Sequence, residues 1–471
     1  MRHFSFVWWS VLAVFAGACS SGGSAQTEAP GMDGSLGTGG SSSGGAATTG
    51  SSSGGGPSTG SSSGGATSSN GGSGGGSGGA GPSDAGGAAS SDTGGAVVAD
   101  AAGGGDAGGG GHRAADAACT ATDMCPAPNG GITFGCEKRF LFGENYAWQN
   151  WGYDFGGGAT GVAGNSATVK AALQDMQSHG ADVIRWWMFQ ELNGNNGVEL
   201  DANGIPTGNA RGTLAADVQA ALSLAAQVGV HYNFTLFSFD DFVFSAGRHD
   251  MAPIVTSDAN RAKLMQFVAL LAQTVESDPN RDRMVSWDVI NEPEWAIGGM
   301  DGDVDASVST GMDPYGDQAF NGGTAGKVYD LVTFAQMETF VKDTVTALHQ
   351  NSSAPVTVGS AAVKWKGAWE HVGLDYYTVH MYDWVNQYYP YTASVASYGF
   401  TLPVVLGEFP NQGLTGVPFA TLLSGIFGKS IGYAGAMPWA YTDQSYPWSG
   451  ATGGSANVQA FAASEPCVTK F

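Results

Sequence analysis

The feature that most constrains the fold is a regular alternation of short apolar runs with longer amphipathic stretches between residues 137 and 445. The runs have the length of buried strands, and the stretches between them have the period of helices. The predicted strands are Phe140–Asn145, Asp182–Trp187, His231–Phe237, Val285–Asn291, Val356–Ser360, Tyr377–His380, Val404–Glu408 and Gly435–Trp439. Strands that alternate with helices form a parallel sheet, and eight such units predict an α/β fold of the (β/α)₈ barrel type.

Start and stop residues mark the predicted helices. Gly180 and Gly229 follow two of the amphipathic stretches, and glycine is common just beyond a helix C-terminus. Ser257 opens a third stretch, as a helix-capping serine would. The predicted helices are Ala167–His179, Thr213–Val228, Ser257–Ser277, Thr333–Gln350 and Pro418–Phe427.

Composition separates the barrel from what precedes it. The 471 residues include 76 glycines, most of them in the first quarter of the chain with Ser, Ala and Thr. Near-repeats such as SSSGG cannot bury enough apolar surface to offset their ordering entropy. We therefore expect residues 19–118 to be a disordered linker with a span of about 50–60 Å. Residues 119–471 then form one domain of a normal size for a barrel.

The first 18 residues have the features of a secretory signal peptide. A short basic start precedes the apolar run Phe4–Phe15, which is too short to span a membrane. The small residues before Cys19 resemble a bacterial lipobox, although Ala16 stands where leucine is usual, and Ala16-x-Ala18 also suits ordinary cleavage. We expect export with a lipid on Cys19 as the only membrane contact, giving a cell-surface or outer-membrane lipoprotein. The alternative is a secreted protein.

The remaining four cysteines lie near the two ends of the predicted domain. They are Cys119, Cys125, Cys136 and Cys467. An even number in an exported domain predicts two disulfides, of which at least one joins the two ends. A zinc site is disfavoured, because the spacings include no CxxC and no nearby histidine pair.

The charge of the chain limits its partners. A formal net charge of −23 disfavours nucleic acid and anionic polymers and is compatible with a neutral substrate. We expect a monomer that requires no cofactor and no metal.

Two of the predicted strands end in a carboxylate. The segments Trp287–Pro293 and Pro403–Phe409 place Glu292 and Glu408 at the ends of apolar runs. Burying a carboxylate there is unfavourable unless the protein uses it. Active sites of this fold lie at the carboxyl ends of the strands. A pair of carboxylates suits glycosidic bond cleavage, because one protonates the leaving oxygen while the other attacks the anomeric carbon.

The Asn-Glu-Pro motif on the fourth strand and the Gly-Glu-Phe motif on the seventh resemble those of (β/α)₈ retaining glycoside hydrolases. The resemblance is greatest to family 5, the cellulases and mannanases, and covers residues 137–445. It implies that Glu292 is the acid/base and Glu408 the nucleophile. It also implies that Asn291 binds the substrate 2-hydroxyl.

Further positions match the same family. The resemblance implies that Arg185 hydrogen-bonds the nucleophile and keeps it ionised. It also implies that His380 and Tyr382 are the substrate-binding His and Tyr of strand six, and that Trp439 is the platform under the sugar. An arginine beside Glu408 should lower the pKa of that carboxyl. In the alternative interpretations, Arg185 forms a structural ion pair, His380 is a core residue and Trp439 packs in the barrel.

Other aromatic and acidic residues have less specific signals. Trp148 and Trp384 follow the first and sixth predicted strands, so we expect them to bind substrate. Asp240-Asp241 could bind substrate or cap a turn, and a cap is the favoured interpretation.

The predicted activity is therefore retaining hydrolysis of a neutral β-linked polysaccharide or oligosaccharide, of the β-1,4-glucan or mannan type. The alternative is a non-catalytic or weakly active carbohydrate-binding surface lipoprotein on the same barrel. Presence of both glutamates and Arg185 favours the enzyme.

Overall fold

The computed structural model describes the barrel domain and the hairpin before it. The described residues are 122–123, 131–134, 137–190, 192, 196–244, 251–297, 328–329, 332–365, 367–428 and 431–468. The predicted signal peptide, Cys19 and the linker lie outside these residues, as do Cys119, Cys125 and Cys136. Cys467 is disulfide-bonded. Within the described ranges, no helix combines the length and apolar character that a membrane span needs.

Eight parallel strands close into a barrel, in the order β10-β12-β13-β14-β17-β4-β5-β8. The strands are β4 (Leu141–Asn145), β5 (Val183–Trp187), β8 (His231–Ser238), β10 (Met284–Asn291), β12 (Val356–Ser360), β13 (Tyr377–His380), β14 (Val404–Glu408) and β17 (Gly435–Ala436). Each predicted strand coincides with one of them to within a few residues, and the predicted barrel is confirmed.

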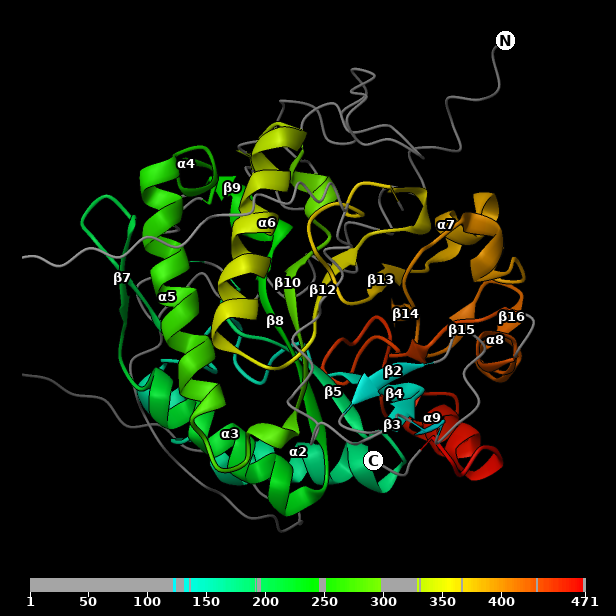
Figure 1. Cartoon of the computed structure of the whole chain (residues 1–471). Helices are drawn as coiled ribbons and strands as arrows, with labels where there is room; N and C mark the ends of the chain where they lie inside the picture. The colour runs from blue at the N-terminus through cyan, green and yellow to red at the C-terminus, as the bar shows by residue number, and fades with distance from the viewer. Residues whose placement is uncertain are drawn as a thin grey trace, which may run out of the picture. The chain divides into compact units, whose positions relative to one another are not determined.

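Helices surround the barrel (Figure 1). They are α2 (Ser166–Ser178), α3 (Leu214–Val228), α4 (Ala252–Val255), α5 (Asp258–Glu276), α6 (Phe334–Asn351), α7 (Asp383–Tyr388), α8 (Phe419–Phe427) and α9 (Gly454–Ser464). The five predicted helices correspond to α2, α3, α5, α6 and α8. Between β12 and β13, the described residues form only a 3₁₀ turn at Val363–Trp365 in place of a helix.

Local chemistry sets the ends of these helices. Gly229 follows α3 with φ 92°, a left-handed conformation that favours glycine. Thr333 and Gln336 form a reciprocal capping box at the start of α6. The side chain of Ser257 accepts a hydrogen bond from the Asn260 N–H at the start of α5. Each cap satisfies backbone groups that the helix itself leaves unpaired.

The barrel interior is layered along its axis. Near the amino ends of the strands, Leu141, Val183, Val285 and Val405 pack in an apolar cluster with Ile132. Ile132 belongs to β2 (Ile132–Phe134), which forms a small sheet with β1 (Thr122–Asp123) and β3 (Glu137–Arg139). This sheet therefore contributes to closing the end of the barrel opposite the strand-end carboxylates.

A neutral polar layer lies above the apolar cluster. The Asn233 amide donates to the Ser286 hydroxyl at 2.8 Å and to the Tyr376 hydroxyl at 3.0 Å. Ser286 Oγ and Tyr376 Oη are 2.7 Å apart. These three residues are named the neutral layer below, and the ring of Tyr376 also packs in the apolar cluster.

The loops carry three further two-stranded sheets. They are β6 (Val198–Leu200) with β7 (Pro206–Ala210), β9 (Val243–Phe244) with β11 (Val328–Tyr329), and β15 (Gly413–Leu414) with β16 (Val417–Pro418).

Candidate active site

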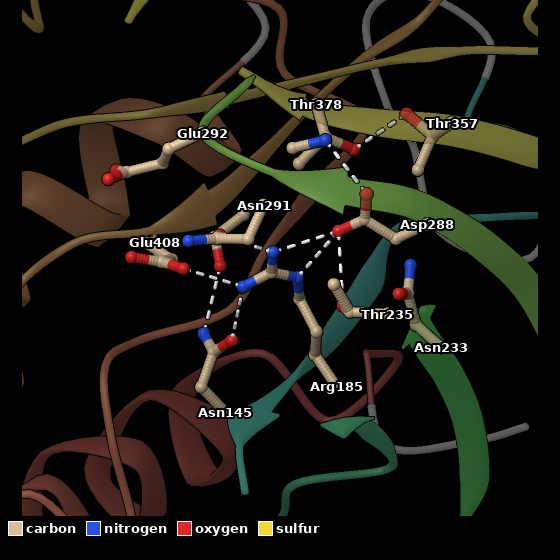
Figure 2. A network of polar contacts seen from close by, with 12 residues as sticks. Asn145, Arg185, Asn233, Thr235, Asp288, Asn291, Glu292, Thr357, Thr378 and Glu408 are labelled. Carbon is tan, nitrogen blue, oxygen red and sulfur yellow. Dashed lines mark hydrogen bonds and ion pairs between the residues drawn. The ribbon is translucent and has the colours of Figure 1, made fainter. Parts of the chain in front are cut away.

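Arg185 lies at the centre of a buried polar network (Figure 2). Its Nη1 donates to Asn145 Oδ1 at 2.9 Å and to Glu408 Oε1 at 2.6 Å. Its Nη2 donates to Asn291 Oδ1 and to Asp288 Oδ2, both at 2.8 Å, and Nε donates to the same Asp288 oxygen at 3.0 Å. All five N–H groups of the guanidinium are therefore used, which fixes its plane.

Glycine on β12 makes room for this side chain. A Cβ atom at Gly359 would lie 2.8 Å from Arg185 Nη2 and 3.0 Å from Asp288 Oδ2. Both distances are shorter than normal van der Waals contact. Any larger residue at this position would therefore displace the guanidinium.

Glu408 ends β14, and both of its carboxylate oxygens accept hydrogen bonds. Oε1 accepts from Arg185, and Oε2 accepts from the Tyr382 hydroxyl at 2.9 Å. Burial raises the pKa of Glu408, His380 and Arg185 oppose this rise, and Glu292 adds to it. The sequence-based expectation that Arg185 lowers this pKa describes only one of these influences, because burial outweighs it.

Glu292 follows β10 and has a left-handed backbone, with φ 48° and ψ 49°. Such a conformation costs a non-glycine residue roughly 1–3 kcal/mol and is typical of functional positions. Oε2 accepts from the Trp295 indole N–H at 2.9 Å, and Oε1 lies 2.8 Å from His380 Nδ1. Burial lowers the pKa of His380 to about 4, so the imidazole is neutral at neutral pH.

The two carboxylates face each other at short range. An oxygen of Glu292 and an oxygen of Glu408 lie within 4.8 Å of each other and of a ring nitrogen of His380. Retaining glycosidases hold their carboxyl groups about 5–5.5 Å apart, and inverting ones about 6.5–9.5 Å. The spacing is therefore that of a retaining pair. Because all four oxygens have side-chain partners, we assign no metal to this group.

Asn291 presents an unused hydrogen-bond donor beside the pair. Its Oδ1 is held by Arg185, whereas its Nδ2 is buried and has no hydrogen-bond partner. A buried donor without a partner is costly in the free protein. It gains a partner if a substrate hydroxyl binds next to it.

Aromatic residues flank the site in two groups. Trp439, Trp187 and Trp148 pack in a cluster separate from the main core, with ring centroids 5.3 to 6.3 Å apart. The ring centroid of Trp384 lies 5.9 Å from that of Trp295, whose indole N–H donates a hydrogen bond to Glu292. Trp148 and Trp439 are thus brought together, and Trp384 lies on the Glu292 side.

Sequence reasoning missed two residues of the site and favoured the interpretation that the structure supports for Asp241. Asp288 and Trp187 contact Arg185, yet neither was expected in the site. Asn145, which stands at the end of the first predicted strand, also contacts Arg185. The signal for Asp288 was an acid inside an otherwise apolar strand. Asp241 Oδ2 accepts from the Ser238 N–H at 2.8 Å, as the favoured turn cap requires.

Comparison with known proteins gives similar chains. The sequence is 27% identical over 338 residues to a mannan endo-1,4-beta-mannosidase of Mytilus edulis, across 67% of this chain and 87% of the relative. A mannan endo-1,4-beta-mannosidase of Cryptopygus antarcticus is 23% identical over 348 residues, covering 68% of this chain and 85% of the relative. The solved structure of beta-mannanase from the blue mussel Mytilus edulis matches with a TM-score of 0.57 and 24% identity, covering 73% of this chain and 97% of that one. No protein-family model matches the chain.

The barrel with its paired strand-end glutamates, taken together with these relatives, defines a glycoside hydrolase. The resemblance of its two strand-end motifs to family 5, the cellulase- and mannanase-like enzymes, is confirmed by these relatives. A non-catalytic carbohydrate-binding protein is not favoured.

Proposed function

We propose that this protein is a retaining endo-β-1,4-mannanase that cleaves by double displacement. The observation that carries the proposal is the Glu292–Glu408 pair within 4.8 Å at the carboxyl end of the barrel. The mannan substrate comes from the names of its relatives, both of which are mannan endo-1,4-beta-mannosidases.

In the first step, a Glu408 carboxylate oxygen attacks the anomeric carbon. The bond from that carbon to the leaving sugar's oxygen breaks, and Glu292 gives its proton to this oxygen. In the second step, the ionised Glu292 takes a proton from water while the water oxygen attacks the anomeric carbon. Glu408 leaves as a carboxylate, and two inversions give net retention.

The neighbouring residues have roles that follow from their contacts. Arg185 and Tyr382 hold the two oxygens of Glu408 and so orient its attack. His380 and Trp295 hold the two oxygens of Glu292. The free Nδ2 of Asn291 is placed to donate to the 2-hydroxyl of the reacting sugar. Such a bond accelerates the reaction if it strengthens in the transition state.

The aromatic residues would bind the sugars on either side of the cleaved bond. We assign Trp439 and Trp148 to one side and Trp384 to the side of the acid, Glu292. Tryptophan offers a flat apolar face on which a sugar ring can pack.

Product analysis tests this function. The purified protein is incubated with β-1,4-mannan and, separately, with β-1,4-glucan, and the products are separated by size. We expect internal cleavage of mannan and much slower cleavage of glucan. NMR of the earliest products should show the β-anomer first. An α-anomer first would exclude retention, and no cleavage of mannan would exclude the proposed substrate.

We also propose that the enzyme is exported and tethered through a lipid on Cys19, with residues 19–118 as a flexible spacer, two disulfides in the domain, and a monomeric state. A single acyl chain anchors only weakly, so stable attachment requires the additional chains of a bacterial lipoprotein. Replacing Cys19→Ser should move full activity from the membrane fraction to the soluble exported fraction. A parent protein that is soluble and carries no lipid mass on Cys19 would contradict the tether.

A further inference from the structure

Asp288 is a fully buried acid that the proposed reaction does not use directly. Its Oδ2 accepts from Arg185 Nε at 3.0 Å, from Arg185 Nη2 at 2.8 Å and from Thr235 Oγ1 at 3.1 Å. Its Oδ1 accepts from the Gly359 N–H at 2.8 Å. Asp288 therefore binds one edge of the guanidinium, while the Nη1 corner of the same group contacts Glu408 (Figure 2).

The charges around Arg185 do not balance. Arg185, Asp288, Glu292, His380 and Glu408, named the Arg185 cluster, are all buried. Before the reaction, Arg185 is positive, Asp288 and Glu408 are negative, Glu292 carries its proton, and His380 is neutral. The cluster then has a net charge of −1, and it would be neutral without Asp288. In a buried site an additional negative charge disfavours ionisation of each nearby carboxyl.

The other groups packed against the cluster do not supply this charge. Arg185 comes from β5, His380 from β13, Glu408 from β14, and Glu292 and Asp288 from β10 and its end, while Tyr376 directly precedes β13. Thr235 on β8 and Thr357 on β12 flank Asp288 in register and do not ionise. Tyr382 donates to Glu408, and burial raises the pKa of Tyr376, so both phenols stay neutral. Glu294 faces away from the cluster, toward Ser360 and Trp369.

We propose that Asp288 is a positioning residue that sets the pH range of catalysis, because it orients Arg185 toward Glu408 and compensates its charge. Without the negative charge of Asp288, the positive charge of Arg185 would lower the pKa of Glu292. Glu292 must stay protonated to act as the acid. Once Glu408 becomes an ester, Arg185 and Asp288 form a neutral pair. Glu292 can then lose its proton and act as the base. The inference rests on the proposed glycosidase mechanism.

The test compares the parent with Asp288→Asn and Asp288→Ala in the full chain. The measurement is kcat/KM against pH on a soluble β-1,4-manno-oligosaccharide. Loss of the negative charge should lower the pKa values of both catalytic carboxyls. Both limbs of the pH profile should therefore move to lower pH, by roughly one pH unit. A role in scaffolding alone would lower kcat and leave both limbs in place.

Asp154→Asn is the matched control. Asp154 is also buried, and it accepts from the Gln149 and Asn150 N–H groups and from the Trp186 indole, away from Arg185. In this variant, both limbs of the pH profile of kcat/KM should stay at the parental pH, even if the melting temperature falls.

Each outcome is decisive. If both limbs of the pH profile stay at the parental pH in the Asp288 variants, the inference is overturned. It is also overturned if circular dichroism shows that neither variant folds, since Asp288 would then be needed for folding. A parent that cleaves no mannan would instead contradict the proposed function and leave no profile to compare.

Discussion

The neutral layer and the Arg185 cluster are stacked in the same barrel, yet they differ in what their polar groups contact. In the neutral layer, Asn233, Ser286 and Tyr376 bond to one another through groups that do not ionise at neutral pH. In the Arg185 cluster, the polar groups are charged or ionisable, and the amide of the adjoining Asn291 keeps a donor free.

This difference separates stability from function. Hydrogen bonds between neutral buried groups contribute modestly to stability and do not respond to pH near neutrality. A buried cluster of charges is costly to maintain and responds to every change of charge within it. Substitutions in the Arg185 cluster should therefore affect activity, whereas substitutions in the neutral layer should affect stability.

The largest effect is expected for Glu408→Ala. Loss of the nucleophile should lower kcat by a factor on the order of 10⁴, while the fold is retained. Near-normal turnover in this variant would contradict the assignment.

Azide distinguishes the two glutamates with an activated aryl β-mannoside. Glu292→Ala keeps the nucleophile, so azide should trap its intermediate as the β-glycosyl azide. Glu408→Ala should give the α-glycosyl azide, because azide then attacks the substrate directly. The same anomer from both variants would mean that the roles are misassigned.

The next effect concerns the free donor of Asn291. Asn291→Ala should lower kcat/KM by roughly 10²–10³-fold, the loss typical of a donor that acts in the transition state. With a substrate that lacks the 2-hydroxyl, the difference in kcat/KM between parent and variant should become smaller, because neither protein can then donate a hydrogen bond to that hydroxyl. If the full difference persists with the 2-deoxy substrate, Asn291 acts through Arg185 instead.

The parts of this site that sequence could predict are those with a strong local signal. Glu292, Glu408 and Arg185 each end or interrupt an apolar run, and the barrel topology brings such positions together. The strands were predictable for the same reason. In contrast, α9 contains only two large apolar residues, Val458 and Phe461, so its sequence gives little periodic signal for a helix.

The contact of Asp288 with Arg185 was not predictable, because β10 departs from simple alternation. Strict alternation would turn Asp288 and Asn291, three positions apart, to opposite faces. A register irregularity between these two residues lets both contact Arg185. The residue pattern of β10 does not predict such an irregularity.

A smaller effect concerns the acid limb of the pH profile. Glu408 must be ionised to attack, and burial raises its pKa above the ordinary value of 4.5. Activity should therefore fall as the pH drops through this raised pKa, so that the half-maximal point lies above pH 4.5. The measurement is kcat/KM against pH, with circular dichroism at each pH to exclude unfolding. A half-maximal point below 4.5 would show that Arg185 and His380 outweigh burial.

The smallest effect is expected in the neutral layer, and it is one of stability. Ser286→Ala removes the hydroxyl that accepts from Asn233 and lies 2.7 Å from the Tyr376 hydroxyl. Asn233 and Tyr376 still bond to each other, so the free energy of unfolding should fall by only about 1 kcal/mol. Because the Ser286 hydroxyl bonds with Asn233 and Tyr376 and carries no charge, kcat/KM and both limbs of the pH profile should match those of the parent. Urea denaturation measures the first quantity and the pH profile the second. A shifted limb with unchanged stability would show that the neutral layer is coupled to the Arg185 cluster, and the separation of the two layers would fail.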